Sequence, residues 1–453
     1  MTIISDIAKK LKSLLNTGGD RGSLMQKNMI FNAFIKGASI IISFLLIPLC
    51  IKYIGEEGYG IWLTLGTVVT WITFFDIGFS NGLRNRFAEA KAFGNHQLAK
   101  EYVSTTFFAI SFIFSLVWII AIIFNNHIDW AFFFKDKIPE NTDELSLLFT
   151  IIVSYICLLS VFKILGTILA ADQRPSVIAF IDLIGQALTL AAIWILMQIE
   201  TGTLLKLGFV FCFLPLVVWI IANFVLFSNR YKSYAPSFRF VKIGRIKDIM
   251  SLGLKFFVIQ VANLVQYQSA NFIIIHYFSA SDVTYYNIVF KYFSIMTMVF
   301  SLFLAPLWSA VTEAYSKKDF AWIKWSIKRF LQIASALSVI CLIMLFCSDF
   351  ILRLWVGDKI ADSINIALII FCCIYTIISF YLNIYVSILN GMGILNIQFI
   401  FAFISPIIYL GLVFLFIQVL NMGIYSLFLA LIFTNFNGMI APFQCYRILK
   451  KNE

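Results

Sequence analysis

Three lysines lie inside long apolar stretches of this sequence: Lys36, Lys163 and Lys291. A charged side chain within a bilayer is costly unless it faces a cavity or meets a partner. The acidic residues in such stretches, Asp76 and Asp182, are too few to balance the lysines, and they are candidates for coupling to a proton or sodium gradient. The pattern predicts a cationic cavity that binds an anionic substrate, such as a phosphate or a sugar acid. The alternative interpretation is a set of structural ion pairs between the lysines and these aspartates.

A second polar cluster is predicted where two apolar helices reach the cytoplasm, and it contains Arg84, Arg86, Glu89, Lys91 and Glu313. One interpretation is the usual excess of basic residues on the cytoplasmic side, combined with local ion pairs. The other is a cytoplasmic gate, in which matched ion pairs form in one conformation and break in another.

No catalytic, metal or cofactor site is expected. The run Gly78-Phe79-Ser80-Asn81-Gly82 fits the pattern G-x-S-x-G, but that pattern works as a nucleophile only at a strand-to-helix turn. Here it ends an apolar helix, so its glycines are expected to permit close helix packing or a helix end. The sequence contains no phosphate-binding loop of the G-x-x-x-x-G-K type and no Cys/His spacing that suits a metal. The eight cysteines are predicted to be small apolar fillers.

The composition requires a membrane protein to position these residues. Of 453 residues, 61% are hydrophobic and 13% are charged, and the mean hydropathy is +0.92. Soluble domains are about 45–50% apolar and about 25% charged. Twelve transmembrane helices are therefore expected in an all-α integral membrane protein, which excludes a large catalytic domain outside the membrane. The predicted spans are 28–50, 58–80, 103–124, 146–170, 177–198, 204–227, 254–277, 284–311, 330–350, 365–389, 396–419 and 424–446.

The distribution of basic residues predicts that both termini are cytoplasmic. With that orientation, 24 of the 34 Lys and Arg residues lie in cytoplasmic segments and six lie in outer loops; the other four are the three lysines named above and Lys255, at the mouth of a span. Such a bias in short loops is a strong signal of orientation. It also explains the net charge of +11 without a nucleic-acid partner.

The two halves of the chain resemble each other. Ile51-Lys52-Tyr53-Ile54 matches Ile275-His276-Tyr277-Phe278, and Glu89-Ala90 matches Glu313-Ala314, both at a sequence offset of 224. Tyr155 pairs with Tyr375 at an offset of 220. Two six-helix lobes are therefore predicted, as in transporters whose substrate site lies between repeats. The expected domains are an interfacial amphipathic segment (1–27), an N-lobe (28–228), a cytoplasmic linker (229–253), a C-lobe (254–446) and a cytoplasmic tail (447–453).

Three short motifs resemble a known family: Tyr53-Ile54-Gly55-Glu56-Glu57-Gly58-Tyr59-Gly60-Ile61-Trp62, then Phe75-Asp76-Ile77-Gly78-Phe79-Ser80-Asn81-Gly82, then Arg86-Phe87-Ala88-Glu89-Ala90. They are similar to Wzx-type polysaccharide flippases of the MOP superfamily, which also contains the drug-exporting MATE proteins and the lipid II flippase. The resemblance implies a MATE-like fold and a location in the bacterial cytoplasmic (inner) membrane. It also implies a substrate, an undecaprenyl-diphosphate-linked oligosaccharide. The candidate partners that follow are membrane lipids, the polysaccharide polymerase and the chain-length regulator.

The function expected from these observations is a flippase for a lipid-linked sugar unit, used for O-antigen or capsule assembly, with Lys36, Lys163 and Lys291 binding the substrate. A MATE-like multidrug exporter is an alternative, but acidic residues would then dominate the cavity. A membrane polysaccharide polymerase or glycosyltransferase is another, but the longest outer loop, 125–145, is short for a catalytic loop. A purely structural scaffold would have no reason to keep lysines within its spans.

Overall fold

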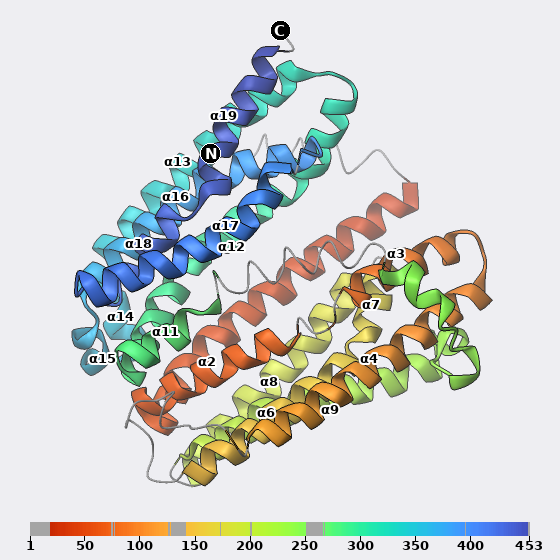
Figure 1. The fold of residues 1–453 in the computed structure, drawn as a ribbon, viewed down its shortest axis with the longest axis horizontal. Coiled ribbons are helices and arrows are strands. Elements are labelled where there is room, and N and C mark those ends of the chain that lie inside the picture. Colours follow the sequence, from red (N-terminus) through yellow and green to blue (C-terminus); the bar gives the residue numbers. More distant parts are fainter. Residues whose placement is uncertain are drawn as a thin grey trace. The chain divides into compact units, whose positions relative to one another are not determined.

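The fold is taken from a computed structural model of the chain. The structure describes residues 19–73, 76, 78–125, 127, 142–172, 174–199, 202–250, 266, 268–394 and 396–451. Within these ranges every regular element is a helix (Figure 1). Eight of the helices are long and apolar enough to cross a membrane. The expectation of an all-helical, multi-pass membrane protein is therefore confirmed, while the number of twelve spans and the cytoplasmic position of both termini stay predictions.

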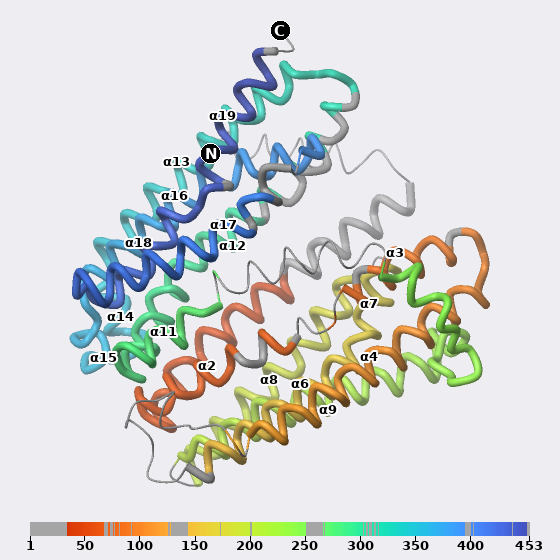
Figure 2. The backbone as a smooth tube through the Cα atoms, in the orientation of Figure 1, coloured from red at the N-terminus to blue at the C-terminus, as the bar shows by residue number. Residues whose placement is uncertain are grey.

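Helix α2 (Gly19–Thr73) contains the first predicted span and most of the second. It kinks at Gly55, whose φ of 78° and ψ of 170° are not helical. A glycine adopts this positive φ without the steric penalty of a side chain. Figure 2 draws the described part of α2 in red and orange. The predicted loop between the first two spans is thus replaced by a kink at one residue, Gly55.

The second predicted span, 58–80, is interrupted near its end. Helix α2 ends at Thr73, and helix α3 (Phe79–Ala92) follows. Gly78 begins α3 with a left-handed φ of 79°. A Cβ atom on Gly82 would overlap the carbonyl oxygen of Ile249. Both roles expected for these glycines, a helix end and close packing, are therefore confirmed.

The remaining helices of the first half of the chain are long and apolar. Helix α3 packs against both α4 and α7, and α8 packs against α9. The fourth predicted span, 146–170, is split into α6 and α7 by a single residue, Lys163. The bounds are α4 (His96–Asn125), α6 (Thr142–Phe162), α7 (Ile164–Ala171), α8 (Pro175–Ile199) and α9 (Leu204–Ser228).

The helices of the second half are organised around one buried helix, α16 (Ile366–Gly391), against which α12, α13, α18 and α19 pack. Phe380 and Ile384 of α16 are buried in this core. The other bounds are α11 (Ala270–Tyr277), α12 (Ala280–Ser316), α13 (Phe320–Phe346), α14 (Ser348–Val356), α15 (Asp358–Ser363), α17 (Asn396–Phe414), a π-helical turn (Leu415–Val419), α18 (Ser426–Phe433) and α19 (Phe436–Lys451).

The chain divides into two compact units. The first unit is formed by residues 1–54, 72–128 and 143–254, and the second by residues 55–71, 129–142 and 255–453. The part of α2 after the kink, residues 55–73, is here called the second arm of α2. Most of it belongs by its contacts to the unit that contains the second half of the chain. The lobe boundaries drawn from the sequence stay a prediction. Residues 1–18 of the expected amphipathic segment and most of the loop 125–145 lie outside the described residues.

One turn recurs at the offset of the predicted internal repeat. Gly94, after α3, has a left-handed φ of 70°, and Lys318, after α12 and at an offset of 224, has a φ of 57°. The next residues, Asn95 and Asp319, each accept a hydrogen bond on the side-chain oxygen from the backbone nitrogen three residues later, at 3.0 and 2.9 Å. The same turn and the same helix cap therefore recur at the predicted offset, and the first residues of α4 and α13 keep that spacing.

A second pair of turns repeats at an offset of 220. The backbone nitrogen of Arg174 donates to the oxygen of Leu169 at 2.8 Å, and the nitrogen of Ile394 donates to the oxygen of Leu389 at 2.9 Å. These turns follow α7 and α16. The repeat is not complete, because α16 runs without interruption past the position that corresponds to Lys163.

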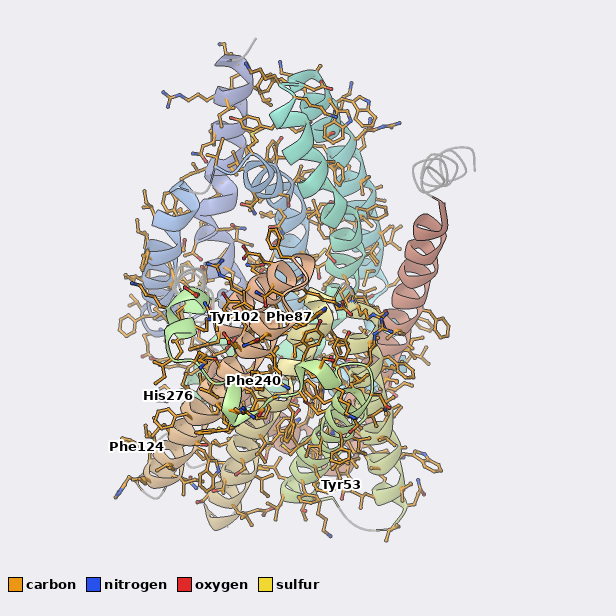
Figure 3. All side chains as sticks on the ribbon, turned by 90° about the vertical axis from the view of Figure 1, so that its right-hand side faces the viewer. Tyr53, Phe87, Tyr102, Phe124, Phe240 and His276 are labelled. Atoms are coloured by element: carbon orange, nitrogen blue, oxygen red, sulfur yellow. The ribbon has the colours of Figure 1, made fainter. Side chains whose placement is uncertain are left out.

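Residues 229–250, here called the strap, are folded against α4. The strap contains two 3₁₀ turns, η2 (Lys232–Tyr234) and η3 (Phe238–Phe240). The backbone nitrogen of Ser237 donates to the hydroxyl of Ser104 at 3.1 Å, and the nitrogen of Lys242 donates to the hydroxyl of Thr105 at 3.0 Å. Figure 3 labels Phe240 on this segment. Most of the segment expected to be a cytoplasmic linker is therefore an ordered part of the first unit.

The cysteines largely follow the expectation. Seven of the eight are buried and none forms a disulfide, which fits apolar fillers. Cys347, between α13 and α14, is exposed.

Candidate functional site

Lys163 occupies the break between α6 and α7, where it is held by residues from two other helices. Its Nζ lies 4.0 Å from Oδ1 of Asp182 on α8. The indole Nε1 of Trp219 on α9 donates to the same oxygen at 3.0 Å, and Nζ of Lys163 lies 5.8 Å from the centre of the indole ring. The side chains of Lys163 and Asp182 are 48% and 39% exposed, so both remain open to a ligand. The lysine–aspartate pair offered as the structural alternative is present in the structure.

A polar track links this pair to α2. The hydroxyl of Ser39 donates to Oε1 of Gln186 at 2.5 Å. Ser39 lies one helical turn after Lys36 on α2, and Gln186 lies one turn after Asp182 on α8. Lys36 itself is exposed. Helix α2, which carries Lys36, thus contacts α8, which carries the Asp182 partner of Lys163, and among the described residues of these contacts there is one carboxylate for two lysines.

Lys291 lies on α12, in the second unit, and is partly buried. Its backbone carbonyl accepts a hydrogen bond from the hydroxyl of Ser294 at 2.7 Å. The three candidate lysines are therefore divided between the two units, and their joint binding of one substrate stays a prediction.

The two aspartates proposed for ion coupling have different surroundings. Asp76 lies in the break before α3, and both of its carboxylate oxygens are 3.1 Å from the backbone nitrogen of Ser80. It therefore satisfies a free backbone donor at a helix start. Asp182 is bonded to side chains, Lys163 and Trp219. A coupling role is untested for either residue.

The predicted cytoplasmic gate is only partly described. Arg86 pairs with Glu89 of its own helix at 3.0 Å, and its Nε lies 3.4 Å from the carbonyl oxygen of Asp248 in the strap. Arg84 is exposed. The side chain of Glu313 lies outside the described residues, so a pair between the two halves of the chain at this position stays a prediction.

A network at the same end of the first unit was not foreseen from the sequence. The carboxylate of Asp172, 13% exposed, bonds to Nζ of Lys91, accepts a hydrogen bond from the Tyr231 hydroxyl at 2.7 Å and lies 3.5 Å from Nε of Arg174. Burial raises the pKa of Asp172, but the bonds from Lys91 and Tyr231 and the nearby positive charges lower it below its usual value. Burial and the bond to Asp172 raise the pKa of Tyr231 to about 12, which keeps its hydroxyl protonated.

Glu56, directly after the kink at Gly55, forms a third cluster. One of its carboxylate oxygens accepts from the Tyr285 hydroxyl at 2.8 Å, and the other lies 3.2 Å from Nζ of Lys359. Its backbone carbonyl accepts from the Thr284 hydroxyl at 2.6 Å. Glu56 lies in a motif singled out in the sequence, but all of these partners come from the second half of the chain. Because these partners are distant in sequence, the residues around Glu56 alone could not predict the contacts.

Sequence comparisons agree with the family resemblance. A family model described as polysaccharide biosynthesis protein matches residues 25–312, more than half of the chain. A protein named for O-antigen export, from Yersinia pseudotuberculosis, is 23% identical over 362 residues, which cover 78% of this chain and 80% of the relative. A protein named as an O-antigen transporter, from Salmonella typhi, is 24% identical over 357 residues, which cover 77% and 78%. Both names describe transport rather than catalysis.

Solved structures share the fold. A multidrug resistance MATE transporter of the MOP superfamily, in an inward-facing conformation, is 12% identical with a TM-score of 0.75, over 91% of this chain and 95% of that one. The lipid II flippase MurJ, in an inward closed conformation, is 16% identical with a TM-score of 0.68, over 93% and 87%. The expected MATE-like architecture is therefore confirmed.

Proposed function

The chain belongs to the polysaccharide biosynthesis protein family, and from this premise we propose that it flips a lipid-linked oligosaccharide across the bacterial cytoplasmic membrane. The proposed substrate is an undecaprenyl-diphosphate-linked repeat unit, moved from the inner to the outer leaflet for O-antigen or capsule assembly. The movement would use alternating access between two conformations. The polymerase and the chain-length regulator remain candidate partners.

The polar track of the first unit is the observation that carries this proposal. Lys36 lies on α2 and Lys163 lies between α6 and α7, and both segments contact α8, whose Asp182 carboxylate balances only one of the two charges. An anionic diphosphate would supply the missing negative charge, and a lysine binds a phosphate group as a point charge. A cationic drug would meet repulsion at the same place.

We further propose that Asp182 links transport to protonation. Neutralising its carboxylate would remove the charged partner of Lys163 and leave the ammonium group free to bind the substrate. Asp76 is the weaker candidate, because its carboxylate bonds to a backbone nitrogen and to no described cation. We therefore expect Asp182→Asn to weaken the dependence of transport on the proton gradient, and Asp76→Asn to act through stability instead.

The experiment is complementation of a strain that lacks the gene, with surface polysaccharide and the sidedness of lipid-linked repeat units as readouts. Each lost charged contact to a phosphate removes about 1.5–3 kcal/mol of substrate-binding free energy. Lys36→Ala and Lys163→Ala should therefore each lower export at least tenfold. Lys291→Ala tests the second unit. Lys163→Arg keeps the charge, and Lys52→Gln removes an exposed charge elsewhere on α2. Membrane levels of each variant are measured alongside.

The outcomes separate the alternatives. Repeat units that accumulate facing the cytoplasm in the deletion strain support the flippase. Repeat units that accumulate on the outer face favour a polymerase that acts after flipping. Intact surface glycan in all strains would contradict the proposal and favour an exporter of another substrate. Equal loss in Lys163→Ala and Lys52→Gln would contradict the cationic site.

A further inference from the structure

A groove lies at one end of the second unit, between α13, α16 and α19. It encloses about 750 Å³. Helix α16 packs against both α13 and α19, and the three helices lie side by side in Figure 1. Lys324 from the first turns of α13 and Lys450 from the last turn of α19 line the groove, together with the apolar side chains of Ile327 and Phe443 and the ring of Tyr385. The groove is therefore lined by two cations from the ends of their helices and by apolar side chains.

The charged residues within the two helices α13 and α19, which flank this groove, are all basic. Within Phe320–Phe346 and Phe436–Lys451 there is no acidic residue. Lys328 and Arg329 are exposed on α13, and Arg447 is exposed on α19. The Nζ of Lys450 lies 5.9 Å from the ring centre of Tyr446. An anion at the mouth of the groove would thus meet several cations and no described carboxylate of the two helices.

The internal repeat indicates what fills this position in the first unit. At the repeat offset Lys324 corresponds to Lys100, and Nζ of Lys100 lies 4.6 Å from the ring centre of Phe240 in the strap. The next turn of α4 bonds to the strap through the hydroxyls of Ser104 and Thr105. The first unit therefore covers this surface of the repeat with its own chain.

The second unit has other residues at the positions that bind the strap. Lys328 and Arg329 correspond to Ser104 and Thr105 at the same offset, so two cations stand where the first unit has two hydroxyl groups that bond to the strap backbone. In the described part of the second unit the matching groove is open. A lysine and an arginine cannot accept hydrogen bonds from a backbone nitrogen, which makes this surface unsuited to a second strap.

We propose that an anionic phospholipid occupies the groove, with its phosphate between Lys324 and Lys450 and an acyl chain along Ile327 and Phe443. Basic pockets between transmembrane helices are a known way of holding anionic headgroups. The charge distribution of the sequence predicts that this end faces the cytoplasm. The lipid would then cover the start of α13, as the strap covers the corresponding part of α4 in the first unit.

The test measures lipid binding to the purified full-length protein in neutral detergent by native mass spectrometry. Phosphatidylglycerol is added, and phosphatidylcholine with the same acyl chains serves as the zwitterionic comparison. Each cation near a bound headgroup contributes roughly a fivefold change in affinity, so Lys324→Gln/Lys450→Gln should bind phosphatidylglycerol about 25-fold more weakly. The matched control, Lys100→Gln/Lys242→Gln, removes two cations from the covered surface of the first unit and should bind like the wild type.

Two further arms keep the test decisive. Lys324→Arg preserves the charge and should retain binding, while Ile327→Trp fills the apolar part and should reduce binding without changing the charge. Thermal melting in the absence of lipid verifies that each variant is folded. Equal weakening in both double variants would overturn the proposal, because binding would follow net charge alone. Displacement of phosphatidylglycerol by a lower concentration of undecaprenyl diphosphate would also overturn it, because the occupant would then be a lipid diphosphate.

Discussion

The network around Asp172 can be tested by removing one charge. Asp172→Asn keeps the size of the side chain and one acceptor oxygen, but it removes the negative charge that faces Lys91 and Arg174. The residue joins three segments: the end of α3, the turn before α8 and the start of the strap at Tyr231. We therefore expect the substitution to destabilise the first unit.

The magnitude follows from the contacts. A hydrogen bond to a charged group contributes about 1.5–3 kcal/mol and a neutral one about 1 kcal/mol, so weakening the bond from Tyr231 costs about 1 kcal/mol. The side chains of Lys91 and Arg174 are 36% and 37% exposed. Solvent screens these pairs, and together they add about 1 kcal/mol. A loss of about 2 kcal/mol lowers the Tm of a unit of this size by roughly 4–8 °C.

The effect should depend on pH in one direction. Because the folded pKa of Asp172 lies below its unfolded value of about 3.9, the carboxylate contributes its full stabilisation above that value. The contribution is lost as the pH falls through the lower, folded value. The difference in Tm between wild type and Asp172→Asn should thus be constant from about pH 5 to 8 and should shrink below about pH 4. Thermal unfolding in detergent across this range measures it.

A double-mutant cycle with Tyr231→Phe provides the control. Phenylalanine keeps the buried ring, which is 1% exposed, and removes only the hydroxyl that donates to Asp172. The two substitutions should couple by about 1 kcal/mol. Additive effects, or a difference in Tm that persists unchanged at pH 3, would refute the assignment of the stability to the charged carboxylate.

Two further predictions concern single positions. A Cβ atom on Gly60 would overlap the backbone oxygen of Ala280, so Gly60→Ala should lower the Tm and the yield of folded protein. The control is Gly66→Ala on the same helix, where a Cβ atom meets open space and the substitution should be neutral or slightly stabilising. Equal behaviour of the two variants would contradict the close contact at Gly60. Cys347 is the exposed cysteine and lies toward a predicted outer loop, so a membrane-impermeant maleimide should label it in intact cells; labelling only after cell lysis would reverse the predicted orientation.

The bounds of several apolar helices could be predicted, because a long apolar run indicates a membrane-spanning helix. Helices α8, α9 and α16 begin and end within two residues of the predicted spans. The breaks at Lys163 and after Thr73 could not be predicted, because apolar sequence continues on both sides of each break. Lys163 pairs with Asp182 on α8, which is distant in sequence, whereas Asp76 in the other break bonds to the nearby backbone nitrogen of Ser80.

The candidate site was partly accessible to sequence reasoning. The cost of burying a charge singles out Lys163 and Asp182 as partners, since few acidic residues lie in apolar stretches. Neutral partners give no such signal. Trp219 and Gln186, which orient the pair and connect it to α2, look like ordinary residues of apolar helices.

The second arm of α2 has a consequence for biogenesis. Its partners are synthesised long after it enters the membrane: Asn271 bonds to the carbonyl of Leu63, and Tyr285 and Lys359 bond to Glu56, at sequence separations of 208, 229 and 303. Helical hairpins held by local contacts can assemble during synthesis. Contacts between residues so far apart in sequence can form only after the second half of the chain has been synthesised. Until then the carboxylate of Glu56 lacks these partners. The nascent first half is therefore an unfinished intermediate, and its exposure to quality control ends only when the second half has been inserted.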